Sequence, residues 1–397
     1  MSVLLIHRFY SPDSPPYASI LKDMRGMLAT QVECVDILTS QPSYKSVDKS
    51  RALERKTKDD LGVIYRLPVF KFNNQKISKA LNFFWFPFIV FLFVLFGKRY
   101  KAVTVSTAPP VILAFSVALV CKIRRMKLVY HCMDIHPEIG RISGEFKKRW
   151  VFNFLKKLDV FTCRVASRII VLSTDMKQSL LQRDESLQDK IDIINNYNLG
   201  GGQLGKHAFF DPNDGKFRIA FAGNIGRFQN LDFLVKALAH ADQVSNIQLV
   251  FVGEGVALKQ LKSLVRELNL GEQVQFIPHQ TVDVAKKIIK DSQIAVVSLQ
   301  EKVIRYAYPS KTMTYLSLGV PVLALVEEDS ELAKTLMKHQ LGWVCSPKNL
   351  SKMSDLFLEV GQSNCLFDEG AIQKFFESKF SKQNFKSNFL GLMKDII

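Results

Sequence analysis

A glycine-containing turn is the first feature of this sequence whose residue types could do chemistry. The stretch "FAGNIGRFQN" (221–230) follows an apolar run, and "LDFLVKALAHA" after it has the apolar spacing of a helix. Gly223, Asn224 and Gly226 therefore lie where a helix N-terminus directs its backbone N–H groups outward, with Arg227 beside them. This arrangement predicts a site for an anion.

A second turn in the same half of the chain has related chemistry. The stretch "YPSKTMTYLSLGVPVLA" (308–324) predicts a turn at Pro309 and Ser310, a helix from Lys311, and a strand at its end. We expect Ser310 to cap the helix. A cation at the positive end of a helix is unfavourable by itself, so Lys311 indicates an anionic partner. We predict that the two turns hold one diphosphate from two sides.

The elements that must position these turns alternate along the chain. Short, nearly all-apolar runs separated by helical patterns are typical of parallel strands covered on both faces. The predicted strands are 3–8, 32–38, 62–67, 102–107, 128–132, 168–173, 191–195, 218–223, 247–253, 274–278, 294–299, 321–326 and 342–346.

A stretch rich in Gly, Asn and Asp, residues 195–216, divides these strands into two series. We therefore predict an α/β fold of two facing Rossmann-like, doubly wound domains with an inter-domain cleft, where ligands meet the carboxyl ends of the strands. The N-terminal domain is 1–200 and the C-terminal domain is 201–370. The amphipathic pattern of 371–397 predicts a C-terminal helix, either packed back on the N-terminal domain or simply ending the chain.

Charge and cysteine usage restrict the class of protein. The net charge is +17, and residues 1–200 hold 31 Lys and Arg against 17 Asp and Glu, a balance of +14. A basic half suits anionic lipid headgroups or a phosphorylated substrate, and no nucleic-acid-binding motif accompanies it. The cysteines show neither CxxC nor zinc spacing, so we expect free thiols in a reducing compartment and no metal. The first ten residues lack the pattern of a signal peptide.

One segment departs from the pattern of a soluble domain. "LNFFWFPFIVFLFVLFG" (81–97) carries no charge, is rich in aromatic residues and contains Pro87. Cations flank it at Lys76, Lys79, Lys98, Arg99 and Lys101. We favour burial at an anionic membrane surface over a core helix. A true membrane span is the third alternative, but it would place the two parts of one domain on opposite sides.

Taken in order, several stretches resemble glycosyltransferase family 4, and most closely its bacterial polysaccharide and lipopolysaccharide branch. In the second half these are "AFAGNIGRFQNLDFLVKAL" (220–238), "LVFVGEGVALKQLKSLV" (249–265), 274–299 and "YPSKTMTYLSLGVPVLA". In the first half, "STAPPVILAFSVALVCKIRRMKLVYHCMDIHPE" (106–138) is similar to that branch's stretch ending in Asp-x-x-Pro-Glu.

The resemblance implies the GT-B fold, with a nucleoside-diphosphate sugar in the C-terminal domain and an acceptor in the N-terminal one. It also implies retention at the anomeric carbon with no cofactor and no required metal, because Arg, Lys and helix N-termini can stabilise a leaving diphosphate. Arg227 and Lys311 then act on the diphosphate. The residues implied at the donor are Gly223, Asn224, Gly226, Gly253, Glu254, Gly255, His279, Pro309 and Ser310. An alternative for "VGEG" is a strand-ending turn.

On the acceptor side, "YHCMDIHPE" (130–138) ends a strand at the cleft edge that the resemblance implies. His131, His136 and Glu138 supply polar groups there, and we assign the positioning of the acceptor to Asp134. The alternative is that Asp134 and Pro137-Glu138 only cap the following helix. We assign no general base.

Three departures from the family pattern bear on activity. The family commonly carries two glutamates eight positions apart around the second turn, where Tyr306 and Thr314 stand here. The family usually carries a lysine a few residues after the Gly-Arg turn. That lysine is missing here, and Gln229 and Asn230 occupy the region. The first loop, 10–19, lacks glycines. Lys311 and Arg227 remain as the main cations.

The leading hypothesis is a hexosyltransferase of lipopolysaccharide, capsule or O-antigen biosynthesis. It takes a sugar from a nucleotide-sugar donor, expected to be UDP-linked, to a lipid-linked saccharide, and is peripheral on the cytoplasmic face of an anionic membrane. The alternatives are a nucleotide-sugar 2-epimerase of the same architecture and a non-catalytic assembly protein that binds a nucleotide sugar. Release of nucleoside diphosphate with and without a lipid acceptor separates the three.

Overall fold

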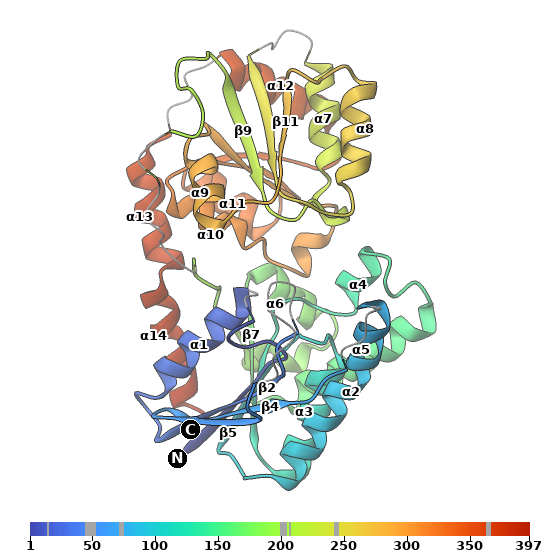
Figure 1. The fold of residues 1–397 in the computed structure, drawn as a ribbon, viewed down its shortest axis with the longest axis vertical. Coiled ribbons are helices and arrows are strands. Elements are labelled where there is room, and N and C mark those ends of the chain that lie inside the picture. Colours follow the sequence, from blue (N-terminus) through green and yellow to red (C-terminus); the bar gives the residue numbers. More distant parts are fainter. Residues whose placement is uncertain are drawn as a thin grey trace. The chain divides into compact units, whose positions relative to one another are not determined.

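The structure is a computed structural model that describes residues 1–13, 16–43, 53–70, 75–198, 205, 208–241, 246–362 and 367–397. The chain divides into two compact units. Unit 1 comprises Met1–Leu199 together with Lys382–Ile397, and unit 2 comprises Gly200–Ser381. Both chain ends belong to unit 1 (Figure 1).

Unit 1 is built on an eight-stranded sheet in the order β3-β4-β2-β1-β5-β6-β7-β8. All described pairs in it are parallel except β3 with β4, which form an antiparallel hairpin at one edge. The strands are β1 (Ser2–Ile6), β2 (Cys34–Ser40), β3 (Lys56–Asp59), β4 (Gly62–Leu67), β5 (Ala102–Ser106), β6 (Lys127–His131), β7 (Arg168–Val171) and β8 (Ile191–Ile193).

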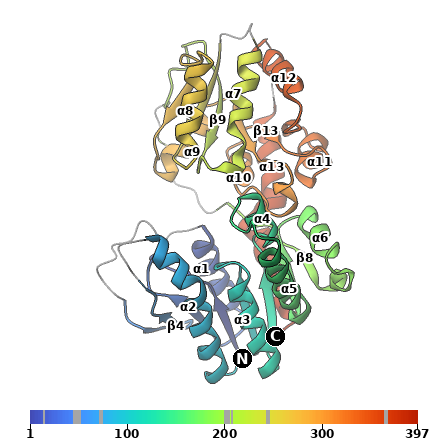
Figure 2. The ribbon, with the colours of Figure 1, turned by 90° about the vertical axis from the view of Figure 1, so that its right-hand side faces the viewer.

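Helices cover both faces of this sheet. On one face, α1 (Pro16–Leu28) and α14 (Lys382–Lys394) share a core with Val3, Leu5 and Ile64. On the other, α2 (Gln75–Phe96), α3 (Ile112–Arg124) and α5 (Arg149–Val165) lie side by side (Figure 2). Side chains alternate along β4. Tyr65 therefore meets Phe93 of α2, whereas Ile64 and Arg66 face the side of α1. The shorter helices α4 (Glu138–Ile142) and α6 (Thr174–Leu181) follow β6 and β7.

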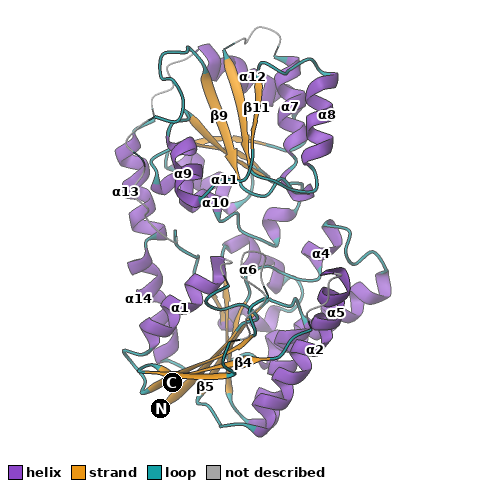
Figure 3. Ribbon diagram, in the orientation of Figure 1, coloured by secondary structure: helices purple, strands orange, loops and turns teal. Residues whose placement is uncertain are grey.

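Unit 2 has a six-stranded, all-parallel sheet in the order β11-β10-β9-β12-β13-β14 (Figure 3). Its strands are β9 (Phe217–Ala222), β10 (Ile247–Val252), β11 (Val274–Ile277), β12 (Ile294–Ser298), β13 (Val322–Leu325) and β14 (Gly342–Cys345). One face carries α7 (Leu231–His240), α8 (Leu258–Glu267) and α12 (Leu350–Gln362). The remaining helices are α9 (Val282–Lys290), α10 (Lys311–Ser317), α11 (Glu331–Lys338) and α13 (Glu369–Phe380). Two doubly wound Rossmann-like units are thus confirmed.

The C-terminal region departs from the single helix expected over 371–397. It forms two helices, because Ser381 takes extended backbone between α13 and α14. Helix α13 packs on α10 in unit 2. Helix α14 lies in unit 1, where Phe385, Phe389 and Met393 join the core under α1.

Helix α2 begins before the apolar segment 81–97 and ends at Phe96, one residue before the end of that segment. Its inner face is buried through Phe86, Val90 and Val94. Its outer face exposes an apolar stripe at helical spacing: Ile77, Leu81, Phe84, Phe88, Leu92 and Phe96. In the described part of the chain, α2 is the one helix long and apolar enough to cross a membrane, with mean hydropathy 2.0 over Ile77–Phe96. Helix α2 is thus buried on its inner face and exposed on its outer face.

Candidate functional site

The glycine turn of unit 2 lies at a topological switch point. From β9 the sheet continues to β10 on one side and to β12 on the other. Doubly wound sheets bind ligands beyond the carboxyl ends of the strands at such a point. Residues 223–227 leave the sheet there, directly after β9. The local sequence thus places the turn where the topology favours a ligand.

Backbone contacts fix this turn against the loop after β10. The N–H of Gly223 donates to Val252 O at 2.8 Å, and the N–H of Ile225 donates to Glu254 O at 2.8 Å. A β-carbon at Gly253 would overlap the carbonyl of Gly223, and one at Gly255 would overlap that of Ile225. Close backbone packing therefore explains why these two positions are glycine, which favours the strand-ending turn as the reason for "VGEG".

Lys311 reaches the same turn from the start of α10. Its Nζ lies 3.6 Å from the ring centroid of Phe221, the fifth residue of β9. A β-carbon at Gly223 would overlap its Cε, so glycine there leaves room for the lysine. Burial lowers the pKa of Lys311 to about 7. No carboxylate in the described residues pairs with it. An anion bound beside Lys311 would favour the charged form of this side chain.

Helix α10 is anchored to the end of β9 by a buried tyrosine. The hydroxyl of Tyr315 accepts from Ala222 N at 3.2 Å. Ser310, however, does not cap the helix: it has helical backbone and its side chain makes no capping hydrogen bond. This corrects the expectation from the sequence. Because α10 starts directly from the turn, Thr312 N bonds to Pro309 O at 3.0 Å instead.

Arg227 occupies a different environment from Lys311. It begins the short 3₁₀ turn Arg227–Gln229, and its side chain is exposed. The turn is held by a bond from Gly226 N to Gln229 Oε1 at 3.0 Å. The guanidinium lines a cavity of 630 Å³ between α7 and α8, which Lys311 does not line. The structure thus brings both cations to the loop after β9 but places their side chains in different surroundings.

The other predicted donor residues border the same edge of the sheet. Asn224, Glu254 and His279 are exposed in the loops after β9, β10 and β11, and Pro309 is partly buried before α10. Their positions at consecutive strand ends agree with one extended ligand surface on unit 2. Their individual roles stay predictions.

In unit 1, the predicted acceptor-side histidine is fully buried. His131 ends β6, and its Nδ1 shares a hydrogen bond of 2.8 Å with the hydroxyl of Tyr17 on α1. His7, directly after β1, contacts Tyr17 with tilted rings whose centroids are 4.6 Å apart, and it bonds to Ser106 at the end of β5. Burial lowers the pKa of both His7 and His131 to about 3, so both rings are neutral at pH 7. Nε2 of His131 has no partner among the described residues.

Asp134 and His136 lie in the turn that follows β6, and both are partly buried. Burial raises the pKa of Asp134 to about 6. It lowers the pKa of His136 to about 4, with the nearby Arg183 charge acting in the same direction. The alternative was that Asp134 and Pro137-Glu138 only cap the next helix. Pro137 is the N-cap residue of α4 and Glu138 lies in its first turn, but no side-chain capping bond forms and Asp134 is not at the cap. The Asp134 carboxyl is therefore available for another partner.

Glu138 is engaged within unit 1. Both of its carboxylate oxygens bond to Arg183, whose Nη1 also bonds to Asp159 Oδ2 at 2.6 Å. Arg183 Nη2 donates to the carbonyl of His136 at 3.0 Å, and Tyr130 donates to Asp159 at 2.9 Å. This buried network holds the turn 134–138 in place. In this structure Glu138 thus helps to hold the turn that carries Asp134 and His136, and its assignment to the acceptor side stays a prediction.

His7, Tyr17, Arg183 and Phe221 were not predicted from the sequence as site residues. His7 and Phe221 could have been found, because each lies at the carboxyl end of a predicted strand. No local signal marks Tyr17 or Arg183, which meet their partners only through the fold. Within the described ranges, no cluster of three or more His, Cys, Asp or Glu side chains is suited to a metal ion.

Comparison with known proteins identifies a domain within unit 2. Residues 206–364 match the family described as Glycosyl transferases group 1. The chain is 21% identical over 338 residues to the probable glycosyltransferase WbjE of Pseudomonas aeruginosa, covering 82% of each sequence.

Solved structures share the fold over the whole chain. Sucrose-phosphate synthase from Thermosynechococcus elongatus aligns with a TM-score of 0.70 at 14% identity, covering 100% of this chain and 98% of that one. The lipopolysaccharide outer core galactosyltransferase WaaB aligns with a TM-score of 0.68 at 12% identity, covering both chains in full. HepE of Anabaena, solved in complex with UDP, aligns with a TM-score of 0.65 at 13% identity and full coverage of both chains.

Proposed function

We propose that this chain moves a sugar from a UDP-linked donor to a lipid-linked saccharide, with retention at the anomeric carbon. The chain is a transferase, and its residues 206–364 match the glycosyl transferases group 1 family. It would act in bacterial surface polysaccharide or lipopolysaccharide biosynthesis, peripheral on the cytoplasmic face of the membrane. The name of WbjE and the UDP complex of HepE support the transferase activity and the donor class, respectively.

The proposal rests mainly on the position of Lys311 at the topological switch point of unit 2. A lysine side chain packed against Gly223 and over Phe221 is a costly arrangement without an anion, because burial disfavours its charged form. A diphosphate at the 223–227 turn would supply that anion. Arg227 would add a second cation from the same loop.

The chemistry that follows is stabilisation of a leaving group. As the glycosidic bond to the diphosphate breaks, negative charge grows on the phosphate oxygens. Lys311, Arg227 and the backbone N–H groups of the turn would each stabilise that charge, and preorganised groups of this kind act mainly in the transition state. The acceptor hydroxyl would be positioned from unit 1 by Asp134, whose turn Arg183 and Glu138 hold.

The apolar stripe of α2 supports a lipid-linked acceptor. It exposes Phe84 at 65%, Phe88 at 52% and Phe96 at 80%, and exposed Lys98 and Arg99 follow the helix directly. Aromatic side chains bordered by cations are typical of an interface with anionic headgroups. A peripheral location follows from this surface as part of the proposal.

The test is release of UDP from UDP-sugars, with and without a lipid-linked saccharide. Acceptor-dependent release supports transfer. Epimerised sugar without an acceptor would indicate a 2-epimerase, and donor binding without turnover would indicate a non-catalytic protein. We also expect EDTA to leave the rate nearly unchanged. Complete inhibition restored by magnesium or manganese would overturn the metal-free mechanism.

A further inference from the structure

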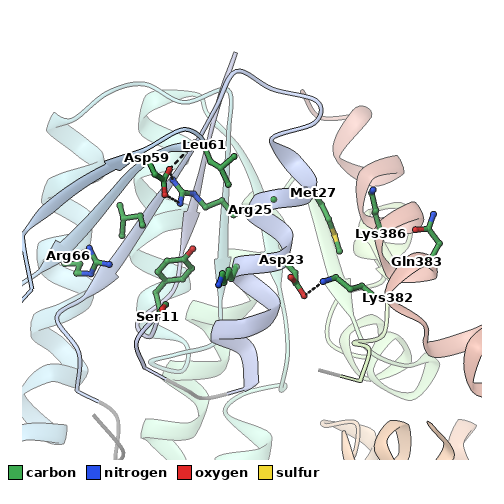
Figure 4. A pocket seen from close by; sticks show the side chains of 14 residues that line it. Ser11, Asp23, Arg25, Met27, Asp59, Leu61, Arg66, Lys382, Gln383 and Lys386 are labelled. Atoms are coloured by element: carbon green, nitrogen blue, oxygen red, sulfur yellow. Dashed lines mark hydrogen bonds and ion pairs between the residues drawn. The ribbon is translucent and has the colours of Figure 1, made fainter. Parts of the chain in front are cut away.

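A second cavity, in unit 1, has no part in the proposed transfer. It has a volume of 870 Å³ and lies on the α1 face of the sheet, between the β3–β4 hairpin and α14 (Figure 4). Five basic side chains line it against two acidic ones: Lys22, Arg25, Arg66, Lys382 and Lys386 against Asp23 and Asp59.

Both carboxylates of the cavity are already engaged. Asp59 binds the guanidinium of Arg25 through two bonds of 2.6 and 2.7 Å. Asp23 binds Lys382 at 2.7 Å and accepts a hydrogen bond from Tyr197 at 2.7 Å. Three cations therefore remain without a described carboxylate partner: Lys22, Arg66 and Lys386.

Arg66 is the most informative of the three. Arg66 is the fifth of the six residues of β4 and is only 9% exposed. Its side chain donates one bond, from Nη1 to Thr57 Oγ1 at 3.0 Å. No ion pair joins it to a carboxylate of the described chain. Burial lowers the pKa of its guanidinium, and the Tyr10 and Glu54 charges offset that shift only in part. A buried arginine lining a cavity can bind an oxyanion through two parallel N–H groups.

Helix α1 leaves room for a ligand at Gly26. Gly26 is on the exposed side of α1, and a β-carbon built there meets no atom within 4 Å. Apolar side chains of Met27, Leu61 and Ile64 line the rest of the cavity. A volume of 870 Å³ is within the range of pockets that hold small molecules. The lining thus combines cations with apolar side chains.

We propose that this cavity binds a phosphorylated, sugar-sized molecule from solution, with its phosphate at Arg66. The occupant is not a bilayer headgroup, because Arg66 faces the α1 side of the sheet whereas the apolar stripe of α2 belongs to the opposite side. The inference goes beyond the proposed transfer and does not depend on it.

Calorimetric titration of the full chain with glucose 1-phosphate tests the proposal, with UDP present at saturation to occupy the donor site. The wild type should bind, and Arg66→Gln should bind at least tenfold more weakly. Gly26→Phe should abolish binding by filling the cavity. Lys127→Gln, which removes an exposed cation at the start of β6, outside the cavity lining, should bind as the wild type does.

Each result bears on the proposal. Absent binding by the wild type, or unchanged binding by both Arg66→Gln and Gly26→Phe, would overturn it. If Gly26→Phe proves unfolded by circular dichroism, Arg66→Gln decides alone. Flotation with phosphatidylglycerol vesicles should be the same for Arg66→Gln and wild type; a loss confined to the variant would identify a bilayer contact and overturn the proposal. Intact UDP release alongside absent glucose 1-phosphate binding would leave the transferase assignment standing.

Discussion

Replacing Lys311 by Met should raise the stability of unit 2 while abolishing most activity. Lowering the lysine pKa from 10.5 to about 7 disfavours its charged form in the folded state by roughly 5 kcal/mol. The side chain keeps some solvent contact, and the Phe221 ring attracts the ammonium by about 1 kcal/mol. We therefore expect a net gain of roughly 2–4 kcal/mol at pH 7, and at least a 100-fold loss of turnover.

The sign of the pH dependence follows from proton binding. Between pH 7 and 10.5 the unfolded chain keeps the Lys311 proton that the folded chain has lost, so wild-type stability rises with pH across this window. The advantage of Lys311→Met should therefore shrink from pH 7 toward pH 10. Lys338→Met, at an exposed position of α11, should match the wild type at every pH.

Unfolding of unit 2 can be followed by itself. Trp343 is the single tryptophan of unit 2, so a background carrying Trp85→Phe and Trp150→Phe reports urea unfolding of that unit. In addition, UDP binding at pH 8 should take up roughly 0.9 proton in the wild type and none in the variant, measured by calorimetry in buffers of different ionisation enthalpy. A destabilised Lys311→Met, or UDP binding without proton uptake by the wild type, would refute the reasoning.

Three further perturbations address the other elements. Arg227→Ala should lower kcat/KM by a factor corresponding to about 2–4 kcal/mol without changing the melting temperature, because the side chain is exposed; unchanged turnover in steady-state assays would contradict its role. Substituting Ser for Phe84, Phe88 and Phe96 should release the protein from anionic liposomes in flotation assays and leave UDP affinity intact. Trp85 is kept because its Nε1 donates a bond to Pro68 O at 3.1 Å. If the wild type stays free of liposomes at low salt, the proposed contact of α2 with a membrane surface is excluded. Arg183→Met should destabilise unit 1 by roughly 3–5 kcal/mol and raise the acceptor KM, while the UDP dissociation constant stays unchanged. Arg168→Met breaks a more exposed pair with Asp192 and should change neither the stability of unit 1 nor the acceptor KM.

Much of the fold was predictable because its signals are local. Nearly all-apolar runs separated by helical patterns gave the strands of two parallel sheets, and the structure confirms two doubly wound units. The strand that escaped prediction, β3, reads "KTKD" and carries no apolar pattern. Its charges suit a sheet edge, where a strand needs no buried face. The break at Ser381 was also missed, because the apolar pattern continues through it while the chain passes from unit 2 to unit 1.

The candidate site, like the fold, was predictable where its signals are local in the sequence. Turn chemistry and spacing predicted the Gly223–Arg227 turn and Lys311 directly, since a strand, a turn and a helix start are properties of adjacent residues. The sequence also determined that Asp134 follows a central strand.

Tertiary structure alone decided the environment of each of these groups. It placed Lys311 over Phe221, enclosed His131 behind Tyr17, and engaged Glu138 with Arg183. These partners are separated by 45 to 114 residues where hydrogen bonds join them. Burial and pKa depend on which distant side chains exclude water from a group, and that information is carried by packing between elements, not by the pattern within any one of them.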